Sequence, residues 1–318
     1  MGKEKQNTTS RLEATYKSAD TEEWLDIHFT RPVGLWWAGW FERWGVHPNT
    51  VTMLSIFLGI AAGLNFYYRD LWHNLLGMLL LMWANFYDSA DGQLARMTGK
   101  KTRWGRILDG FAGDVWFYTI YVCICLRLMP QFIPGTSYTW GWIIWVVAAF
   151  SGLVCHAKQC ALADYYRNIH LYFLKGREGS ELDSYHGQRE LLHATPRKGN
   201  FWWRLFLWGY GNYTYGQEQM TPAFQQLMRY LHEQKGQGEN DAFRADFRKC
   251  SLPLMKYTNI LTFNTRAIVL YVSCLIDEPW IYFVAELTVF TVLAVYMRWR
   301  HECMCRRFLR RLQAGVYH

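Results

Sequence analysis

Six long apolar stretches place the strongest limit on how this chain of 318 residues can fold. They occupy residues 51–68, 71–87, 107–129, 139–155, 258–276 and 280–297. Each is roughly 17–23 residues long, the length that an α-helix needs to cross the hydrocarbon core of a bilayer. Inside lipid, every backbone polar group must be bonded within its own element, which favours helices. We therefore predict an all-α, polytopic integral membrane protein with six transmembrane helices.

The composition agrees with a membrane protein. Hydrophobic residues make up 51% and aromatic residues 18% of the chain, while charged residues make up only 19%, below the usual ~25%. Such a chain is not intrinsically disordered. The eight cysteines lie mostly in apolar runs, and the chain is not a small secreted domain that needs disulfides. We interpret them as small buried apolar residues.

Basic residues predict the orientation in the membrane. Lys and Arg gather between the second and third stretches, between the fourth and fifth, and after the sixth. The opposite loops carry no net positive charge, so the basic loops are expected to face the cytosol. Residues 1–22 are polar and lack the apolar core of a signal peptide. Six spans place both termini on one side, so we predict that both termini and the loop between the second and third stretches are cytoplasmic.

Polarity and tryptophan content divide the rest of the chain. Residues 20–46 look amphipathic and rich in Trp, as in a helix that lies in the membrane interface. The predicted domains are an N-terminal cytosolic or interfacial segment 1–46, a six-helix core 47–165 and 258–305, a cytosolic insertion 166–257, and a basic C-terminal tail 306–318.

The chemistry-bearing part of the sequence is 88–114, where carboxylates gather at the ends of two predicted spans. Charged residues at such depth are costly and mark functional sites. Asp88 and Asp91 are three residues apart and share a helix face. Asp109 and Asp114 begin the next helix. Carboxylates from two adjacent helices predict a site for a divalent cation such as Mg²⁺, Mn²⁺ or Ca²⁺, and Arg96 supplies a planar cation suited to phosphate.

This pattern resembles the CDP-alcohol phosphotransferase family. The resemblance rests on Asp88-x-x-Asp91-Gly92-x-x-Ala95-Arg96, followed after eight residues by Gly105 and after three more by Asp109. An upstream Pro48-Asn49-Thr50-Val51-Thr52 is similar to the family's entry to its first helix, although its second Thr comes one residue early. The resemblance covers the predicted six-helix core and does not obviously cover the insertion.

One position departs from the family pattern. The family expects its last Asp four residues after Asp109, where this chain has Gly113, and Asp114 comes one residue later. A π-bulge at Gly110 and Gly113 would return Asp114 to the site, since such bulges often occur at functional sites. The alternative is that the fourth carboxylate is lost. In the family this residue is the favoured general base.

The resemblance implies a substitution at phosphorus with release of CMP. The resemblance also implies two Mg²⁺ or Mn²⁺ ions held by Asp88, Asp91, Asp109 and Asp114, with Asp109 and Asp114 as the catalytic residues. The nucleotide and its phosphates would contact Asn49, Thr52, Gly92, Ala95, Arg96 and Gly105. The implied partners are the lipid bilayer, a CDP-linked donor and an alcohol acceptor, without nucleic acid, and family members tend to be homodimers.

Several alternatives stay open at this point. The donor is either CDP-diacylglycerol, with a small polar alcohol of the inositol phosphate, glycerol phosphate or serine class as acceptor, or a soluble CDP-alcohol with diacylglycerol or a ceramide-like lipid as acceptor. A catalytically inactive CDP-lipid-binding relative is a third reading, and a transporter with intramembrane carboxylates is a fourth. Arg266 either binds a phosphate of the acceptor or pairs with Glu286. The basic turn Lys100, Lys101, Arg103 and Arg106 either grips phosphate or fixes topology.

Overall fold

The computed structural model describes residues 18–100, 102–176, 180–234 and 239–317, and every regular element in these ranges is a helix. One isolated antiparallel bridge joins Phe132 and Thr139. The all-α prediction is confirmed for this part of the chain. Predictions that concern residues 1–17 and Lys101, and the side chains of Arg103 and Arg106, lie outside the described residues.

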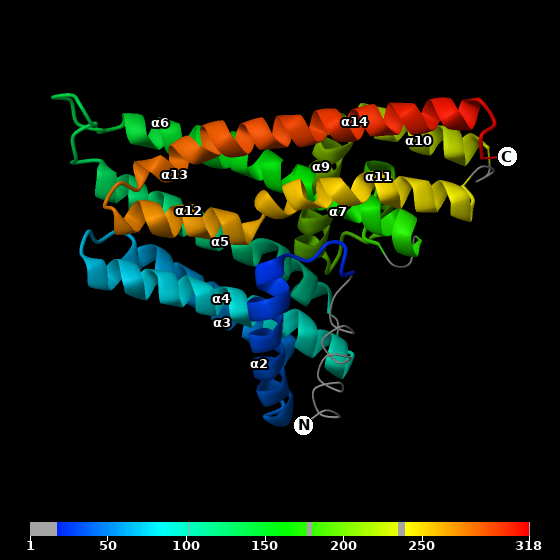
Figure 1. The fold of residues 1–318 in the computed structure, drawn as a ribbon. Coiled ribbons are helices and arrows are strands. Elements are labelled where there is room, and N and C mark those ends of the chain that lie inside the picture. Colours follow the sequence, from blue (N-terminus) through cyan, green and yellow to red (C-terminus); the bar gives the residue numbers. More distant parts are fainter. Residues whose placement is uncertain (1–17, 101, 177–179, 235–238, 318) are drawn as a thin grey trace, which may run out of the picture. The chain divides into compact units, whose positions relative to one another are not determined.

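Figure 1 shows the helices in chain order by colour. Their bounds are η1 (Asp26–Thr30), α2 (Arg31–Arg43), α3 (Pro48–Asn65), α4 (Leu71–Thr98), α5 (Arg103–Leu128), α6 (Ile143–Ala149), η2 (Phe150–His156), α7 (Ala157–Lys175), α8 (Tyr185–Ala194), α9 (Phe201–Met220), α10 (Pro222–Glu233), α11 (Asp241–Ile260), α12 (Phe263–Leu275), α13 (Trp280–Ala285), η4 (Glu286–Phe290) and α14 (Thr291–Gln313). The elements marked η are π-helical.

The helices form two compact units, each described by itself. Unit 1 contains the described residues up to Cys155 together with Asn264–Leu287. Unit 2 contains His156–Phe263 and the chain from Thr288 onward. These boundaries differ from the predicted division into core, insertion and tail, because α14 packs with α7, α10 and α11 in unit 2. The basic residues expected in a tail begin on α14 itself, which continues to Gln313.

Helices α3, α4 and α5 make up the centre of unit 1, and α3 and α4 run side by side. Two glycines of α3 allow a close approach to α5. A Cβ at Gly59 would lie 2.0 Å from Cδ1 of Trp116, and one at Gly63 would lie 2.8 Å from Cγ2 of Thr119. Small residues four apart let helix backbones come close together, as in membrane helix pairs.

Helix α2 packs across α4 through one face. Ala38 and Phe41 form a buried cluster with Ala90 and Leu94 of α4. The opposite face of α2 carries the exposed rings of Trp36, Trp40 and Trp44. Neighbouring rings along this row meet edge to face. The helix is therefore amphipathic, as expected, and its place in the membrane interface stays a prediction.

A buried arginine joins the helix ends of unit 1 that lie away from the carboxylates. Arg127 of α5 donates hydrogen bonds to the backbone oxygen of Phe66 at 3.1 Å and to Oδ1 of Asn74 at 2.9 Å. It also pairs with Oδ1 of Asp277 at 2.8 Å. Arg69 approaches the same carboxylate at 2.5 Å. Arg127 lies inside a predicted span, and its charge is tolerated there because its guanidinium bonds to three oxygens, one of them a carboxylate oxygen.

Three helical stretches are long and apolar enough to cross a membrane, judged over the described residues by length and composition: Ile107–Leu128, Ile143–Lys175 and Trp280–Gln313. The other predicted stretches also fall largely within helices. The fifth is interrupted between Ile260 and Phe263, which leaves α12 with 13 residues. At 1.5 Å per residue such a helix extends about 20 Å, less than the hydrocarbon core. The count of six spans and the cytoplasmic orientation stay predictions.

Unit 2 is built around α7, α11 and α14. Its core is aromatic, with Phe173 packed against Phe247 and both Phe243 and Phe247 packed against Phe308. The carboxylate of Glu302 on α14 accepts a hydrogen bond of 2.7 Å from the backbone nitrogen of Ala223 and so caps α10. The predicted insertion is therefore helical and sits on α7 and α14.

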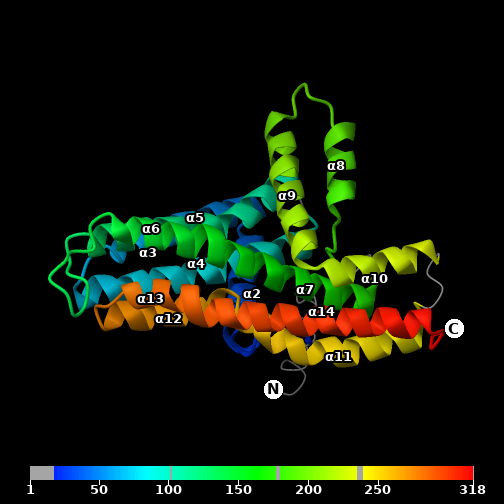
Figure 2. The ribbon, with the colours of Figure 1, turned by 90° about the horizontal axis from the view of Figure 1, so that it is seen from above.

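Helices α8 and α9 form a hairpin within unit 2 (Figure 2). Arg204 of α9 donates to the backbone oxygens of Leu192, at 2.7 Å, and Thr195, which satisfies the C-terminal end of α8. The far end of α9 is attached to α7, where Nε2 of Gln217 donates to the backbone oxygen of Ala161 at 2.9 Å.

Candidate active site

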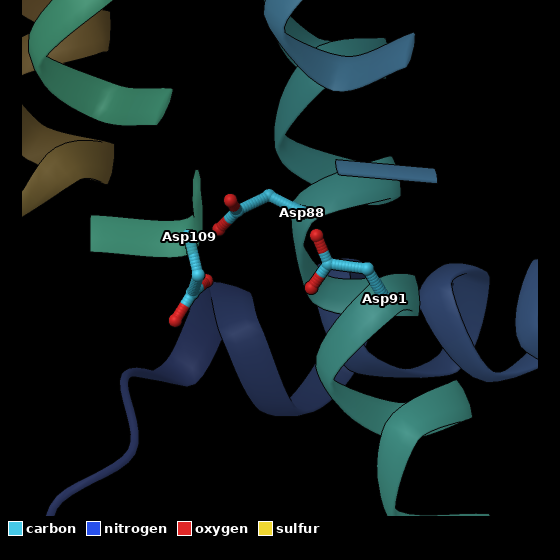
Figure 3. Close-up of side chains that lie close together, drawn as sticks. All are labelled: Asp88, Asp91 and Asp109. Atoms are coloured by element: carbon cyan, nitrogen blue, oxygen red, sulfur yellow. The ribbon is translucent and has the colours of Figure 1, made fainter. Parts of the chain in front are cut away.

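Three carboxylates from two helices converge in unit 1. Asp88 and Asp91 project from α4 and Asp109 from α5 (Figure 3). One oxygen from each lies within 4.8 Å of the others. The pairing of Asp88 with Asp91 follows from their spacing of three on one helix. Asp109 joins them because of the turn between the two helices.

That turn is built by two local signals. Helix α4 ends at Gly99, whose φ of 67° is left-handed and suits glycine. Thr102 then caps α5, its Oγ1 accepting a hydrogen bond of 2.9 Å from the backbone nitrogen of Gly105. The chain reverses direction within a few residues, so the beginning of α5 lies beside the end of α4.

Asp91 is the most informative member of the cluster. Its side chain is buried, with 4% of the residue exposed, and its Oδ2 has no hydrogen-bond partner among the described residues. Asp91 lies just after the predicted membrane span 71–87. Burial, together with the charges of Asp88 and Asp109, raises the pKa of Asp91 well above its usual value. A hydrogen bond from Thr52 lowers this pKa, but by less than the other effects raise it. A buried carboxylate oxygen without a donor is a position that a cation would stabilise.

The donor set fits a divalent metal. Carboxylate oxygens are the hard ligands that Mg²⁺ and Mn²⁺ prefer. Burial and the charge of Asp109 also raise the pKa of Asp88. A buried and a half-buried carboxylate of this kind accept either protons or a shared cation. Asp88, Asp91 and Asp109 are therefore the residues that could hold a metal ion.

The predicted nucleotide-binding residues surround the cluster. Thr52 is buried on α3 and contacts Asp91. Asn49 accepts a hydrogen bond of 3.2 Å from the hydroxyl of Thr102. A Cβ at Gly105 would lie 2.8 Å from Oδ1 of Asn49. Gly105 thus leaves room for the Asn49 side chain beside the start of α5, which the sequence alone did not show.

Gly92, Ala95 and Arg96 follow one another along α4 just past the carboxylates. Gly92 and Ala95 are half-buried. The guanidinium of Arg96 folds back over Gly92, where a Cβ would meet Nη1 at 3.5 Å. A side chain at position 92 would therefore contact Arg96. The small residue leaves room for the arginine to lie along the helix near the cluster.

A second arginine, Arg31, was not among the predicted site residues. It begins α2, and its backbone oxygen accepts a hydrogen bond of 3.1 Å from Gln93 of α4. Its guanidinium pairs with Glu22 at 3.0 Å. Partial burial and the like charge of Arg31 lower the pKa of Arg96, and the charge of Arg31 also stabilises ionised Asp88. Two guanidinium groups thus lie close to the carboxylates.

A weak signal in the sequence pointed to this arginine. Arg31 lies within the Trp-rich segment directly before Pro32. The proline occupies the first turn of α2, and the π-helix η1 precedes it. A charged residue at such a junction is a candidate for function, but only the packing of α2 on α4 shows which site it serves.

Asp114 does not join the three-carboxylate cluster. Helix α5 is α-helical from Arg103 to Leu128, so the expected π-bulge at Gly110 and Gly113 is absent from it. Five residues along a regular helix correspond to a rotation of about 140° and a rise of about 7.5 Å. Gly113 occupies the position that would have faced the cluster. The role of Asp114 stays a prediction.

Arg266 is fully buried on α12 and pairs with Glu286. This is the ion pair that the sequence left open beside a role in acceptor binding. The carboxylate begins the π-helix η4. Nearby Asn264 donates to Glu23 at 2.7 Å and to Asp26 at 2.9 Å, which ties the N-terminal segment to α12. Acceptor binding by Arg266 stays a prediction.

Comparisons with known proteins concern the same part of the chain. Residues 45–170 match the family model of the CDP-alcohol phosphatidyltransferases. This segment is therefore similar to the proteins of that family. The matched segment contains all three clustered carboxylates, Asn49, Thr52, Arg96 and Gly105. No solved structure matches the chain.

Three relatives illustrate the similarity. A phosphatidylinositol phosphate synthase of Streptomyces avermitilis is 39% identical over 72 residues, which are 23% of this chain and 29% of the relative. An archaetidylinositol phosphate synthase of Pyrococcus horikoshii is 35% identical over 65 residues, 20% of this chain and 33% of the relative. A bifunctional IPC transferase and DIPP synthase of Aquifex aeolicus is 28% identical over 107 residues, 34% of this chain and 22% of the relative.

The chain spans about a third or less of the length of these curated relatives. The match to the family model and the apolar helices together indicate a membrane protein. The family model ends at residue 170, before α8 to α11.

Proposed function

We propose that this chain is a metal-dependent membrane phosphotransferase that moves a phosphatidyl group from CDP-diacylglycerol to a hydroxyl of a small polar alcohol and releases CMP. The observation that carries the proposal is the cluster of Asp88, Asp91 and Asp109. It lies on the two helices that bear the signature of the matched family. The relatives named as inositol phosphate synthases support an inositol phosphate as the first acceptor to test.

In the proposed reaction, the oxygen of the acceptor hydroxyl forms a bond to the phosphorus of the phosphatidyl group. The bond from that phosphorus to CMP breaks, and CMP leaves with the electron pair. Bound Mg²⁺ or Mn²⁺ would supply charge neutralisation to the diphosphate and to the departing CMP. We propose that Arg31 and Arg96 hold phosphate oxygens. Asn49, Thr52 and Gly105 are the residues proposed to contact the nucleotide.

The hydroxyl proton must go to a base as the new bond forms. The family pattern assigns that role to the position that is Gly113 here. Asp114 is the nearest replacement in the sequence, and the regular α5 turns it away from the cluster. We propose it as the proton acceptor, and its substitution tests the assignment directly. Asp109, which is exposed, is the second candidate for the proton acceptor.

The test is CMP release by the purified full-length protein in liposomes with Mg²⁺ or Mn²⁺. CDP-diacylglycerol is offered with inositol phosphate, glycerol phosphate and serine, and soluble CDP-alcohols are offered with diacylglycerol and ceramide. We expect release only with CDP-diacylglycerol. Asp91→Asn should abolish it, while Glu190→Gln, which alters an exposed carboxylate of α8, should not. Release only from soluble CDP-alcohols would contradict the proposal and would instead indicate transfer of a phospho-head group to diacylglycerol or ceramide.

A metal-binding readout separates catalysis from binding. A ligand that binds only the folded state raises the unfolding midpoint. We expect Mn²⁺ to raise that midpoint in the parent protein and in Asp114→Asn, but not in Asp91→Asn. Metal-dependent stabilisation without CMP release in any pairing would favour an inactive CDP-lipid-binding relative. The displaced Asp114 is the observation that supports this second possibility.

A further inference from the structure

The hairpin of α8 and α9 presents an apolar stripe to its surroundings. Phe201, Trp202, Leu205 and Trp208 are 66%, 60%, 46% and 53% exposed. At 100° per residue, Phe201, Leu205 and Trp208 lie on one side of α9. The buried Leu207, Gly211 and Thr214 lie on the other side. We call the four exposed side chains the α9 stripe.

The neighbouring helix α10 shows that such a stripe is not general in unit 2. Its buried side is apolar, with Phe224, Leu227 and Leu231. Its exposed side carries Gln226 and Arg229. That is the ordinary division of a helix at a water-exposed surface. The α9 stripe instead exposes two indole rings and a phenyl ring in a row, which marks an interaction surface.

The segment that carries the stripe is charged with one sign only. No acidic residue occurs between Leu191 and Gln217, whereas Arg197 and Lys198 are exposed in the turn that precedes α9. Trp beside Lys or Arg is the composition of a segment that lies at the boundary between lipid headgroups and acyl chains. Cations next to an apolar stripe complement anionic lipid.

The attachment of α9 to α7 indicates how deep α9 lies relative to the hydrocarbon core of the membrane. The apolar helical stretch begins at Ile143. About 20 residues of helix cross a hydrocarbon core, so an untilted helix would leave it near residue 162. Gln217 of α9 bonds to the backbone of Ala161, and Tyr213 donates to Asp164 at 3.4 Å. Helix α9 crosses α7 at this level (Figure 2).

We propose that the α8–α9 hairpin docks on the membrane surface, with the α9 stripe embedded at the headgroup boundary of anionic lipid and Arg197 and Lys198 beside the headgroups. The inference does not depend on the proposed transferase activity. It gives the helices that follow the family-matched segment a lipid-binding role.

The test places an environment-sensitive fluorophore on the stripe. The full-length protein with Cys250→Ser and Cys303→Ser, which removes its exposed thiols, is labelled at Leu205→Cys with a nitrobenzoxadiazole group. It is reconstituted in liposomes of phosphatidylcholine and phosphatidylglycerol. The matched control carries the label at Gln226→Cys on the polar side of α10. Lipid with a nitroxide near the headgroup and soluble iodide serve as the two quenchers.

We expect the nitroxide lipid to quench the label at 205 at least twofold more than the label at 226, and iodide to show the reverse order. Arg197→Gln with Lys198→Gln should reduce lipid quenching at 205 in vesicles that contain phosphatidylglycerol. Equal iodide quenching at both positions would overturn the proposal, because the stripe would then lie in water. Protection of position 205 from both quenchers would also overturn it, since a protein surface such as a second copy would then cover the stripe.

Discussion

At the scale of single residues, the site depends on close approach as much as on charge. Oδ1 of Asn49 accepts a hydrogen bond from Thr102 and lies where a side chain at position 105 would begin. Arg96 lies over Gly92, at a distance where a Cβ would make ordinary contact with it. The small residues of the signature therefore position protein groups here, in addition to leaving space for a nucleotide.

The first prediction concerns Gly105. In Gly105→Ala, the new Cβ would meet Oδ1 of Asn49 at 2.8 Å and Oγ1 of Thr102 at 3.1 Å, so the Asn49 side chain must move and its hydrogen bond with Thr102 is disturbed. We expect CMP release to fall at least about tenfold, equivalent to ~1.4 kcal/mol in the barrier. Gly216→Ala is the control, because a Cβ there meets nothing within 4 Å. Unchanged activity of Gly105→Ala would show that the contact is not needed.

The second prediction concerns Arg31. A hydrogen bond to a charged group contributes about 1.5–3 kcal/mol, so Arg31→Ala should raise the KM for the CDP-linked donor roughly 10- to 100-fold. Arg43→Ala, at the other end of α2, should not, because its guanidinium lies over Trp40. Glu22→Gln frees Arg31 from its partner. A role in phosphate binding predicts no rise in KM for that variant, whereas a purely structural ion pair predicts the same defect in both variants.

At the scale of elements, the site is set by how three helices pack. Helix α4 supplies two carboxylates, α5 supplies the third, and α3 fixes the distance between them through Gly59, Gly63 and Asn49. Helix α2 adds Arg31 by lying across α4. Each helix has a recognisable start or stop, but their mutual distances depend on glycine contacts across helices.

The third prediction tests this packing. In Gly59→Ala, the Cβ would lie 2.0 Å from the indole of Trp116, a large ring buried between the helices. Overpacking of this kind typically costs about 1–3 kcal/mol of stability. Thermal unfolding in detergent should show the loss. Gly39→Ala on α2, where a Cβ meets nothing within 4 Å, should be neutral or slightly stabilising. Equal midpoints for the two variants would contradict the close approach of α3 and α5.

At the scale of the whole molecule, charge balance decides the conditions under which the fold is stable. Asp277 lies in the turn between α12 and α13 with a φ of 58°, a left-handed conformation that Asp and Asn tolerate. It accepts hydrogen bonds from both Arg69 and Arg127. Burial opposes its ionisation, but the two arginines outweigh that effect and lower the pKa of Asp277.

The fourth prediction follows from this shift. A carboxylate with a lowered pKa in the folded state adds stability above its unfolded pKa of about 3.9, and this contribution is lost as the pH falls through the folded value. Thermal unfolding of the parent protein should therefore lose part of its stability below about pH 4. Asp277→Asn keeps the left-handed backbone and removes the titration. Its midpoint should be lower at neutral pH and should approach that of the parent in acid. A constant difference across the pH range would contradict the prediction.

The sequence by itself determined the helical class, the three clustered carboxylates and the family of the matched segment. Apolar stretches of spanning length leave the backbone no other bonding pattern, and the spacing of Asp88 and Asp91 fixes their common face. The signature through Asp109 is local in sequence, so no tertiary information was needed to find it.

Only the tertiary structure decided which other groups meet the carboxylates. Arg31 reaches the site because α2 packs on α4, and Arg266 is engaged by Glu286, twenty residues away in sequence. The π-bulge expected near Asp114 did not form, because nothing in α5 interrupts the regular bonding of the helix. The exposed side of α9 could likewise be identified only once its buried side was known. These features depend on contacts between helices that are distant in sequence, so the residue pattern of one segment cannot predict them.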